Sequence, residues 1–428
     1  MGYNMDTNKV LELIHKGEYN CNFVDIYVDE AQLEYQKKRY VNAIMKFREH
    51  YGDGDINIFS APGRSEISGN HTDHQHGKVL ACAINMDAIG IVKKVEDKEV
   101  RVVSDDSEEI VVDITDLTIR EEEKGSTLAL IRGVLAGIHD KGYQIGGFHA
   151  YITSDVLIGS GVSSSAAFET LIGTILSGLY NNMAVSPIEI AQIGQFAENI
   201  YFGKPCGLMD QMACSIGSLV YIDFLNVENP MVEKIPFDLE AYGYSLCITD
   251  TKGSHADLTD EYAAVPEEMK RVANYFGKEV LVDVSPNEFL DHIEKLRGVL
   301  SDRCILRTIH FFGENKRVEE EVNALKYGAI HSFLEIVKAS GDSSYKFLQN
   351  VYSVKDVHQQ NVSVALALSE MVLGNNGVCR VHGGGFAGTM LMIIDKNKID
   401  EILPKLNETY GKGNVMLVNL VENGTIKL

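Results

Sequence analysis

The chain has 428 residues, of which 45% are hydrophobic, and its formal net charge is −22 at pH 7. This length is typical of two packed lobes of about 200 residues each, and the apolar content argues against a disordered chain. The negative charge argues against sequence-independent binding to nucleic acid or to an anionic membrane. Any anionic ligand must therefore be held by backbone N–H groups and a few well-placed cations.

The cysteines and the N-terminus bear on the cellular compartment. The seven cysteines are scattered and form no CxxC pair, which argues against a disulfide framework and against a structural zinc site. Asp6, Lys9 and Glu12 stand where a signal peptide would need an apolar run. No apolar stretch is long enough to cross a bilayer. We therefore expect a cytoplasmic protein.

Apolar periodicity predicts helices and strands in mixed order. Asp29 can cap a helix in which Tyr40, Ile44 and Phe47 recur at helical spacing. A short strand, Ile56 to Ser60, then leads into a turn at 61–64. Further strands are expected within 79–112 and at 149–154, 218–224, 244–251, 390–394 and 414–420, with helices opened by Ser126 and by a capping box at 186–189 that continues to about Gly203. The pattern predicts α+β lobes, with a helical lead-in over 1–55, an N-terminal lobe over 56–235 and a C-terminal lobe over 236–428.

A first polar motif combines Ala61-Pro62-Gly63-Arg64 with the stretch from Gly69 to His74. It brings an arginine and several hydrogen-bonding side chains close together. Asp73 can accept hydrogen bonds from two hydroxyls at once, which suits the vicinal diol of a sugar. A polar surface turn explains the same residues equally well. A third interpretation is a metal site, because imidazole and carboxylate groups are common ligands; its members would be His71, Asp73, His74 and His76.

A second motif, Gly159 to Ala167, lies between a predicted strand and a predicted helix. Its glycines allow an anion to approach the backbone, and the helix N-terminus presents free N–H groups with the positive end of the helix dipole. The hydroxyls of Ser164 and Ser165 can bind phosphate oxygens or magnesium. No Gly-Lys-Ser/Thr follows, so this is not a Walker loop. A phosphate-binding loop is favoured over a flexible loop capped by serine.

A third motif, Arg380 to Gly388, is rich in glycine and precedes an apolar strand. Such a run suits a backbone that wraps tightly against another loop or a ligand. On its own, a plain turn is the simpler explanation.

In this order and at these separations, the three motifs resemble those of the GHMP kinases and, within them, the galactokinases. The resemblance extends from about residue 56 to the C-terminus and includes Cys82 to Asn85, Pro205 to Gln211 and Asp260 to Tyr262. It implies two α+β lobes, the N-terminal one like the second domain of ribosomal protein S5 and the C-terminal one ferredoxin-like.

The resemblance also implies an ATP- and Mg²⁺-dependent sugar 1-kinase, most simply one that converts D-galactose and ATP to galactose 1-phosphate and ADP. It assigns transition-state stabilisation to Arg64 and the catalytic carboxylate to Asp210. The other implied contacts are Gly159, Ser160, Gly161, Val162, Ser163, Ser164 and Ser165 for the ATP phosphates, Ser104 for the nucleotide, Ser165 and Glu198 for Mg²⁺, and Asn70, His71, Asp73, Tyr262 and the Gly207 backbone for the sugar.

The chain departs from the galactokinase pattern near the implied sugar site. Asn70 replaces a glutamate that accepts a hydrogen bond from the 6-hydroxyl of the sugar. The other departures are His74-Gln75 for Tyr-Asn, Leu157 for the proline before the phosphate loop, and Ala263 to Pro266 for Asn-x-Arg-Arg. An amide can still accept that bond, but it does not repel a carboxylate at C6. Galacturonate and L-arabinose therefore remain alternative substrates.

Two other functions compete with a kinase. Some relatives of the galactokinases are sensors that bind galactose and ATP without turnover, and they lack two residues of the phosphate loop, whereas the Ser-Ser-Ser-Ala-Ala run is complete here. A metal-dependent hydrolase would use the histidine-rich stretch and need no ATP. For a kinase, the sequence leaves open whether Asp210 removes the hydroxyl proton or only holds the hydroxyl in line, and it predicts no oligomeric state.

Overall fold

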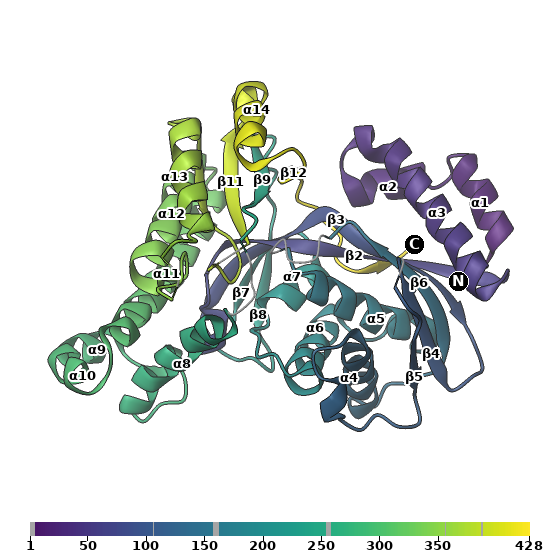
Figure 1. The fold of residues 1–428 in the computed structure, drawn as a ribbon, viewed down its shortest axis with the longest axis horizontal. Helices are drawn as coiled ribbons and strands as arrows, with labels where there is room; N and C mark the ends of the chain where they lie inside the picture. The colour runs from purple at the N-terminus through teal and green to yellow at the C-terminus, as the bar shows by residue number, and fades with distance from the viewer. Residues whose placement is uncertain (1–4, 106, 157–161, 254–257, 356, 387) are drawn as a thin grey trace.

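The computed structural model describes residues 5–105, 107–156, 162–253, 258–355, 357–386 and 388–428. Within these residues, a sheet of nine strands forms the N-terminal lobe (Figure 1). Its strands are β1 (Met5–Asp6), β2 (Asp55–Ser68), β3 (Lys78–Lys94), β4 (Glu99–Ser104), β5 (Ile110–Asp113), β6 (Phe148–Ser154), β7 (Leu219–Asp223), β8 (Met231–Ile235) and β13 (Ile426–Lys427).

The order across this sheet is β1-β2-β3-β6-β4-β5, with β13 beside β2, β7 beside β3 and β8 beside β7. The pair β4 and β6 is parallel, and the other pairs are antiparallel. Because β13 is the last strand in the sequence, the C-terminal end of the chain returns to the N-terminal lobe. The expected division at residue 235 falls between β8 and the first strand of the second sheet.

Helices cover both faces of the larger sheet (Figure 1). On one face, an apolar cluster that includes Phe47, Ile89 and Tyr151 joins the sheet to α1 (Thr7–His15), α2 (Asn20–Tyr27) and α3 (Leu33–Tyr51). On the other face lie α4 (Thr127–Asp140), α5 (Ser164–Tyr180), α6 (Pro187–Phe196) and α7 (Met209–Ile216). The predicted helical lead-in is thus a layer that packs on the sheet.

The C-terminal lobe contains, in its described residues, an antiparallel four-stranded sheet in the order β10-β11-β9-β12. Its elements are β9 (Tyr244–Asp250), α8 (Thr259–Tyr275), α9 (Pro286–Asp291), α10 (Ile293–Val299), α11 (Asp302–Lys326), α12 (Ile330–Ser343), α13 (Asn361–Leu373), β10 (Gly377–Val381), β11 (Thr389–Asp395), α14 (Ile399–Tyr410) and β12 (Val415–Val418). Along β11, Met390 and Met392 pack with α13 and α14, whereas Leu391 packs with α12. This alternation is the two-residue period of a strand that is buried on both faces.

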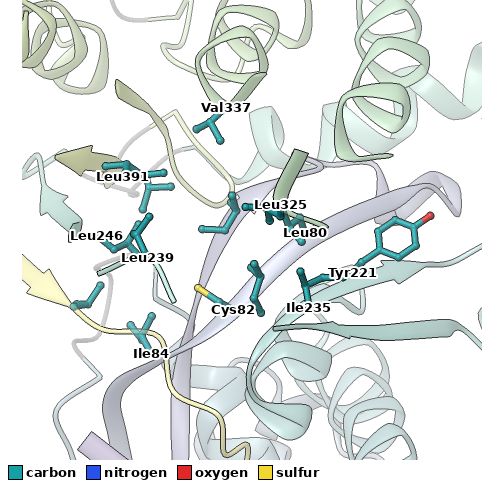
Figure 2. Close-up of a cluster of buried hydrophobic side chains, with 14 of the residues drawn as sticks. Leu80, Cys82, Ile84, Tyr221, Ile235, Leu239, Leu246, Leu325, Val337 and Leu391 are labelled. Atoms are coloured by element: carbon teal, nitrogen blue, oxygen red, sulfur yellow. The ribbon is translucent and has the colours of Figure 1, made fainter. Parts of the chain in front are cut away.

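One apolar cluster joins the two lobes (Figure 2). Leu80, Cys82 and Ile84 of β3 pack in this cluster with the second sheet and with helices of the C-terminal lobe. The partners include Leu246 and Leu391 of the second sheet, Leu325 of α11 and Val337 of α12. Burial of apolar surface contributes roughly 25 cal/mol per Å². The shared core therefore fixes the two lobes against each other.

The strand β2 is longer than the sequence predicts. It continues from Asp55 to Ser68, so the turn expected at 61–64 is wrong. The pairing with β3 shifts register between Pro62 and Arg64. A bulge is one of the places where a strand accommodates proline, which has no N–H to donate. Arg64 therefore stands on a strand and not in a loop.

Other predicted elements are confirmed. Ser126 caps α4, and Ser186 with Glu189 forms the capping box of α6. Beyond Phe196 the expected helix becomes a π-helical turn, Ala197–Phe202, which ends at Gly203 in the left-handed conformation. Such turns occur frequently at functional sites. None of the helices in the described part of the chain has the length and apolar content needed to cross a membrane.

Candidate active site

A bidentate ion pair joins Arg64 of β2 to Asp210 in the first turn of α7. Arg64 Nε donates to Asp210 Oδ1 and Nη2 donates to Oδ2, each at 2.7 Å. Burial disfavours the charged form of both groups, but the attraction and hydrogen bonds between them favour it more strongly. The pKa of Arg64 is therefore raised and that of Asp210 is lowered. Arg64 is buried, whereas the Asp210 side chain is 33% exposed. The pair is therefore charged at neutral pH and accessible from the Asp210 side.

The end of the predicted phosphate loop contacts this pair. Ser163 adopts a left-handed conformation with φ of 61° at the start of α5, and its hydroxyl donates to Asp210 Oδ2. The carbonyl of Val162 accepts a hydrogen bond from Arg64 N at 3.2 Å. Gly159, Ser160 and Gly161 lie outside the described residues. Ser164 begins the helix, where the first N–H groups have no acceptor within the helix.

Glu198 lies on the π-helical turn and meets the second serine of the helix. Ser165 Oγ donates to Glu198 Oε1 at 3.3 Å, and Lys204 Nζ lies 3.1 Å from the same oxygen. Gln211 Nε2 donates at 3.0 Å to Glu198 Oε2 and also at 3.0 Å to Glu169 Oε2. A hydroxyl and a carboxylate oxygen are hard donors that suit Mg²⁺. The donor set therefore fits the metal that the motif implies.

Sequence reasoning missed three residues of this cluster: Glu169, Lys204 and Gln211. Glu169 is fully buried, and its burial together with the charge of Glu198 raises its pKa well above the ordinary value. Gln211 follows Asp210 in the Pro205 to Gln211 stretch that carries the resemblance, which was the available signal. Nothing in the sequence indicates that its amide bridges two carboxylates.

Asp73 and Gly207 lie directly against each other. A Cβ at Gly207 would come within 1.7 Å of Asp73 Oδ2, so glycine is required there. Asp73 Oδ2 accepts a hydrogen bond from Met209 N at 3.3 Å, and Oδ1 accepts one from His74 N at 3.0 Å. The expected sugar loop thus reaches the start of α7, next to Asp210.

Asn70 lies deeper, at the junction of the lobes, and is fully buried. Its amide nitrogen donates to Glu66 Oε2 at 3.0 Å and to Gly383 O at 2.7 Å. Its amide oxygen accepts from Ser344 Oγ at 3.2 Å and from Asn350 Nδ2 at 2.7 Å. An amide offers two donors and two lone pairs, and the protein itself uses all of them. The expected contact with a sugar would need one of these bonds to be exchanged.

The glycine-rich third motif wraps against the sugar loop. His71 Nε2 lies 3.1 Å from the carbonyl of Gly384, and burial with the nearby His74 lowers the pKa of His71 to about 3. The ring is therefore neutral and donates this hydrogen bond. Tyr262 OH donates to Gly385 O at 2.7 Å, and a Cβ at Gly384 would lie 2.7 Å from the Tyr262 ring. Close approach, and not a plain turn, explains the glycines.

Ser104 lies apart from these contacts. It ends β4 and pairs with Ile152 of the parallel strand β6. It therefore lies near the end of the sheet from which the chain continues into 157–161, and its backbone N–H faces Ser107 Oγ at 3.3 Å. Its nucleotide contact stays a prediction.

The histidine-rich stretch does not form a metal centre in the part of the chain that is described. The rings of His71 and His74 stack at 5.5 Å, but among the described residues no group of three or more His, Cys, Asp or Glu side chains is arranged to hold a metal ion. The geometry gives the hydrolase interpretation no support.

Comparison with known proteins agrees with the motifs. Residues 45–94 match the galactokinase galactose-binding signature, and residues 129–218 match the N-terminal domain of GHMP kinases. A galactokinase from Actinobacillus pleuropneumoniae serotype 5b is 31% identical over 372 residues, which cover 86% of this chain and 93% of that protein. The chain belongs to the galactokinase family. It is accordingly a sugar phosphotransferase, as the resemblance implied.

One further galactokinase agrees with the family, and two solved structures agree with the fold. A galactokinase from Clostridium tetani is 27% identical and matches over 89% of this chain and 95% of its own length. The crystal structure of Lactococcus lactis galactokinase complexed with galactose superposes with a TM-score of 0.78 at 23% identity, covering 90% of this chain and 98% of that one. A mevalonate kinase superposes with a TM-score of 0.60 at 15% identity, over 86% of this chain and 99% of that one. The two-lobed GHMP kinase fold is therefore confirmed.

Proposed function

We propose that this galactokinase transfers the terminal phosphoryl group of ATP to the 1-hydroxyl of D-galactose. The observation that carries the proposal is the contact of Ser163 with the Arg64–Asp210 pair, beside the Ser165–Glu198 pair. This arrangement joins a phosphate-loop residue, a fixed positive charge, an ionised carboxylate and a hard-ion donor set within one site.

Arg64 and Asp210 would act on the reacting groups. Phosphoryl transfer depends mainly on alignment and charge neutralisation, because its transition state is loose and anionic. Arg64 would neutralise charge that develops on the transferring group. Asp210 has a lowered pKa and is a weak base. We therefore infer that it accepts a hydrogen bond from the sugar hydroxyl and orients it, and that the proton leaves along this bond only after the new O–P bond has begun to form.

Ser165 and Glu198 would hold Mg²⁺ through their oxygens, which lie 3.3 Å apart. When bound, Mg²⁺ neutralises phosphate charge. Gln211 would orient Glu198, since it donates to the oxygen that does not face Ser165. Lys204 would add positive charge at the same place. Ser104 and the segment Gly159 to Ser164 would contribute the remaining nucleotide contacts.

Asp73 and the Gly207 backbone would bind the sugar, because they lie against each other at the start of α7. His71 and Tyr262 would border the sugar, because their hydrogen bonds to Gly384 O and Gly385 O hold both side chains against the glycine-rich loop of the third motif. Asn70 would contribute by holding this loop in place. Galactose would then be recognised chiefly from the Asp73 side.

We also propose a cytoplasmic location. All seven cysteines fall within the described residues and are free thiols there. Free thiols without disulfides suit a reducing compartment.

An ADP-release assay over several sugars tests the proposal. We expect galactose to be turned over fastest, as in the galactokinase family. L-arabinose and galacturonate differ from galactose only at C6, and the Asn70 amide is already hydrogen-bonded by the protein. Their rates relative to galactose therefore show whether another group recognises the 6-hydroxyl. Binding of galactose and ATP without ADP release would favour a sensor. Faster turnover of galacturonate than of galactose would overturn the substrate assignment while leaving the kinase chemistry intact.

A further inference from the structure

A buried polar cluster lies where the N-terminal helices meet the strands β2, β3 and β6. We call it the Arg39 cluster; its members are Tyr27, Arg39, Ser60, Asp87 and Asp155. Asp87 accepts hydrogen bonds from Arg39 Nη1 at 2.5 Å, Tyr27 OH at 2.8 Å and Ser60 Oγ at 2.5 Å. Arg39 is 9% exposed and Asp87 is 1% exposed. A charge pair buried with this many hydrogen bonds holds its partners in a single arrangement.

Arg39 also holds the end of β6. Its Nη2 donates to Asp87 O at 2.8 Å and to Thr153 O at 3.3 Å, and its Nη1 lies 3.2 Å from Asp155 Oδ2. Tyr35 OH donates to the other carboxylate oxygen of Asp155 at 3.0 Å. Asp155 N donates to Asp87 O at 2.9 Å. The backbone of Asp155 is thus fixed by β3, and both of its carboxylate oxygens are fixed by α3.

Asp155 lies directly before the phosphate loop. Val156 follows it, the chain continues through 157–161, and the described structure resumes at Val162. Both flanking valines contact the strand that carries Arg64. A Cβ at Gly63 would lie 3.0 Å from Val162 O and 3.2 Å from Val156 Cγ1.

The same cluster also fixes the strand that carries Arg64. Asp87 pairs with Pro62 across β2 and β3, at the bulge that precedes Arg64. Ser60, which donates to Asp87, lies on β2 as well. One buried carboxylate therefore connects the arginine strand, and through Arg39 the start of the phosphate loop, to α3.

We propose that Arg39 and Asp155 are positioning residues for the phosphates of ATP: through this ion pair α3 fixes where the phosphate loop begins relative to Arg64. The inference rests on the proposed nucleotide site at Ser163 to Ser165. It assigns a task to the helical lead-in beyond covering the sheet. Asp73 and Gly207 belong to other segments, so nucleotide binding should depend on the Arg39 cluster more than sugar binding does.

The test uses the full chain with graded substitutions. Asp155→Asn keeps the side-chain shape and removes its charge, and Tyr35→Phe removes one donor from an exposed residue. Arg39→Lys keeps the charge, but a single ammonium group cannot reproduce the planar fork that reaches both carboxylates and two carbonyls. The readouts are the Kd for ADP with Mg²⁺ by calorimetry, the KM for ATP, the KM for galactose and the Tm.

We expect Asp155→Asn to raise the Kd for ADP and the KM for ATP by roughly 10-fold, because small displacements of positioned groups have large effects. Arg39→Lys should act in the same direction, and Tyr35→Phe should raise both by about 2-fold. The KM for galactose should change by less than about 2-fold.

Two controls separate positioning from general destabilisation. Lys37→Ala lies on the same helix and removes an amine that pairs with Glu34. Ile402→Val removes a methylene from the apolar cluster around α14, away from the Arg39 cluster, and should lower the Tm. Both should keep wild-type affinity for ADP. Wild-type ADP affinity in Asp155→Asn, or an equal loss of affinity for ADP and galactose, would overturn the inference. A wild-type protein that binds no ADP would overturn the proposed function itself, and the inference with it.

Discussion

Two polar regions begin close together in the sequence, one at Arg64 on β2 and the other at Asn70 in the loop that follows β2. Their side chains are arranged differently. At Arg64 and Asp210, opposite charges meet and the carboxylate is 33% exposed, with lone pairs available to a ligand. At Asn70, the side chain is fully buried and its bonds end on other protein groups. Under the proposed function, the first region binds substrate and stabilises charge, whereas the hydrogen bonds of the second region join the two lobes.

The second region extends well beyond Asn70. Arg380 Nη2 donates to Glu66 Oε1 at 2.8 Å, and Glu314 Oε1 accepts a hydrogen bond from Gly69 N at 3.0 Å. These contacts join β2 and the residue that follows it, in the N-terminal lobe, to β10 and α11 in the C-terminal lobe. When one group of a buried hydrogen-bond network is removed, its partners are left buried without hydrogen bonds, and the protein is destabilised. Substitutions here should change stability first, and those at Arg64 should change rate first.

The largest effect is expected for Arg64→Ala. Turnover should fall by at least ~10²-fold, because the charge that neutralises the transition state is lost. The Tm should fall only slightly, since Asp210 is partly exposed and can be hydrated. Rates of ADP release and the galactose Kd by calorimetry test this. Arg297→Ala, which breaks an exposed Arg–Asp pair at 2.8 Å, is the matched control. Normal turnover in Arg64→Ala would remove this residue from the mechanism.

Next is Asn70→Glu, which restores the residue type of the family pattern. The new carboxylate would face Glu66 Oε2 and Gly383 O, which now accept hydrogen bonds from the amide. We expect a loss of about 3 kcal/mol in the free energy of unfolding in urea, because an unpaired buried charge is costly. The double variant with Glu66→Gln should recover part of the loss, since it supplies a donor. Unchanged stability with a higher kcat/KM for galactose would contradict the conclusion that protein groups use all the hydrogen bonds of the Asn70 amide.

A smaller effect is expected for Glu198→Gln. An amide oxygen binds Mg²⁺ less strongly than a carboxylate does, so about 10-fold more Mg²⁺ should be needed for half-maximal ADP release. The Mg²⁺-dependent rise in Tm with ADP present should weaken in parallel. Glu121→Gln, at an exposed pair with Lys124, should leave both measurements unchanged. An unaltered Mg²⁺ requirement in Glu198→Gln would exclude this carboxylate as a metal ligand.

The smallest effect is expected for Glu321→Gln in the junction. Burial raises the pKa of Glu321 to about 8, although Ser68 Oγ donates to it. A carboxyl group whose pKa is raised by folding contributes stability below its unfolded pKa, and this contribution is lost as the pH rises through the folded value. Between pH 7 and pH 9 the variant should therefore gain on the order of 1 kcal/mol relative to wild type, because about one pKa unit of the shift lies in this range. Urea unfolding at both pH values measures this, and a difference that does not depend on pH would contradict it.

The residues of the candidate site could be selected from the sequence because they lie in short motifs. Ser163, Ser165 and Asp210 each lie in a contiguous stretch whose residue types indicate phosphate or metal binding, and folding brings these stretches together. The role of Asn70 could not be predicted in this way. Its partners Ser344, Asn350 and Gly383 are 274, 280 and 313 residues away in the sequence, and no local pattern encodes such distant hydrogen bonds.

The same distinction applies to the fold. Helix starts such as Ser126 and Ser186 could be predicted, because capping depends on a few adjacent residues. The continuation of β2 through Pro62 could not, because the bulge depends on the register with β3. The return of β13 to β2 depends on packing at the far end of the chain. Sequence patterns therefore predict elements more reliably than the pairing of those elements.

The most direct test of the account is product formation by Asp210→Asn, followed by phosphorus NMR with galactose, ATP and Mg²⁺. Wild-type protein should form galactose 1-phosphate, and the variant should form it at least ~10²-fold more slowly, while its galactose Kd stays within about 3-fold of wild type. Such a result would assign the rate to the Arg64–Asp210 region and sugar affinity mainly to other residues. Wild-type rates of galactose 1-phosphate formation in Asp210→Asn would contradict the central claim.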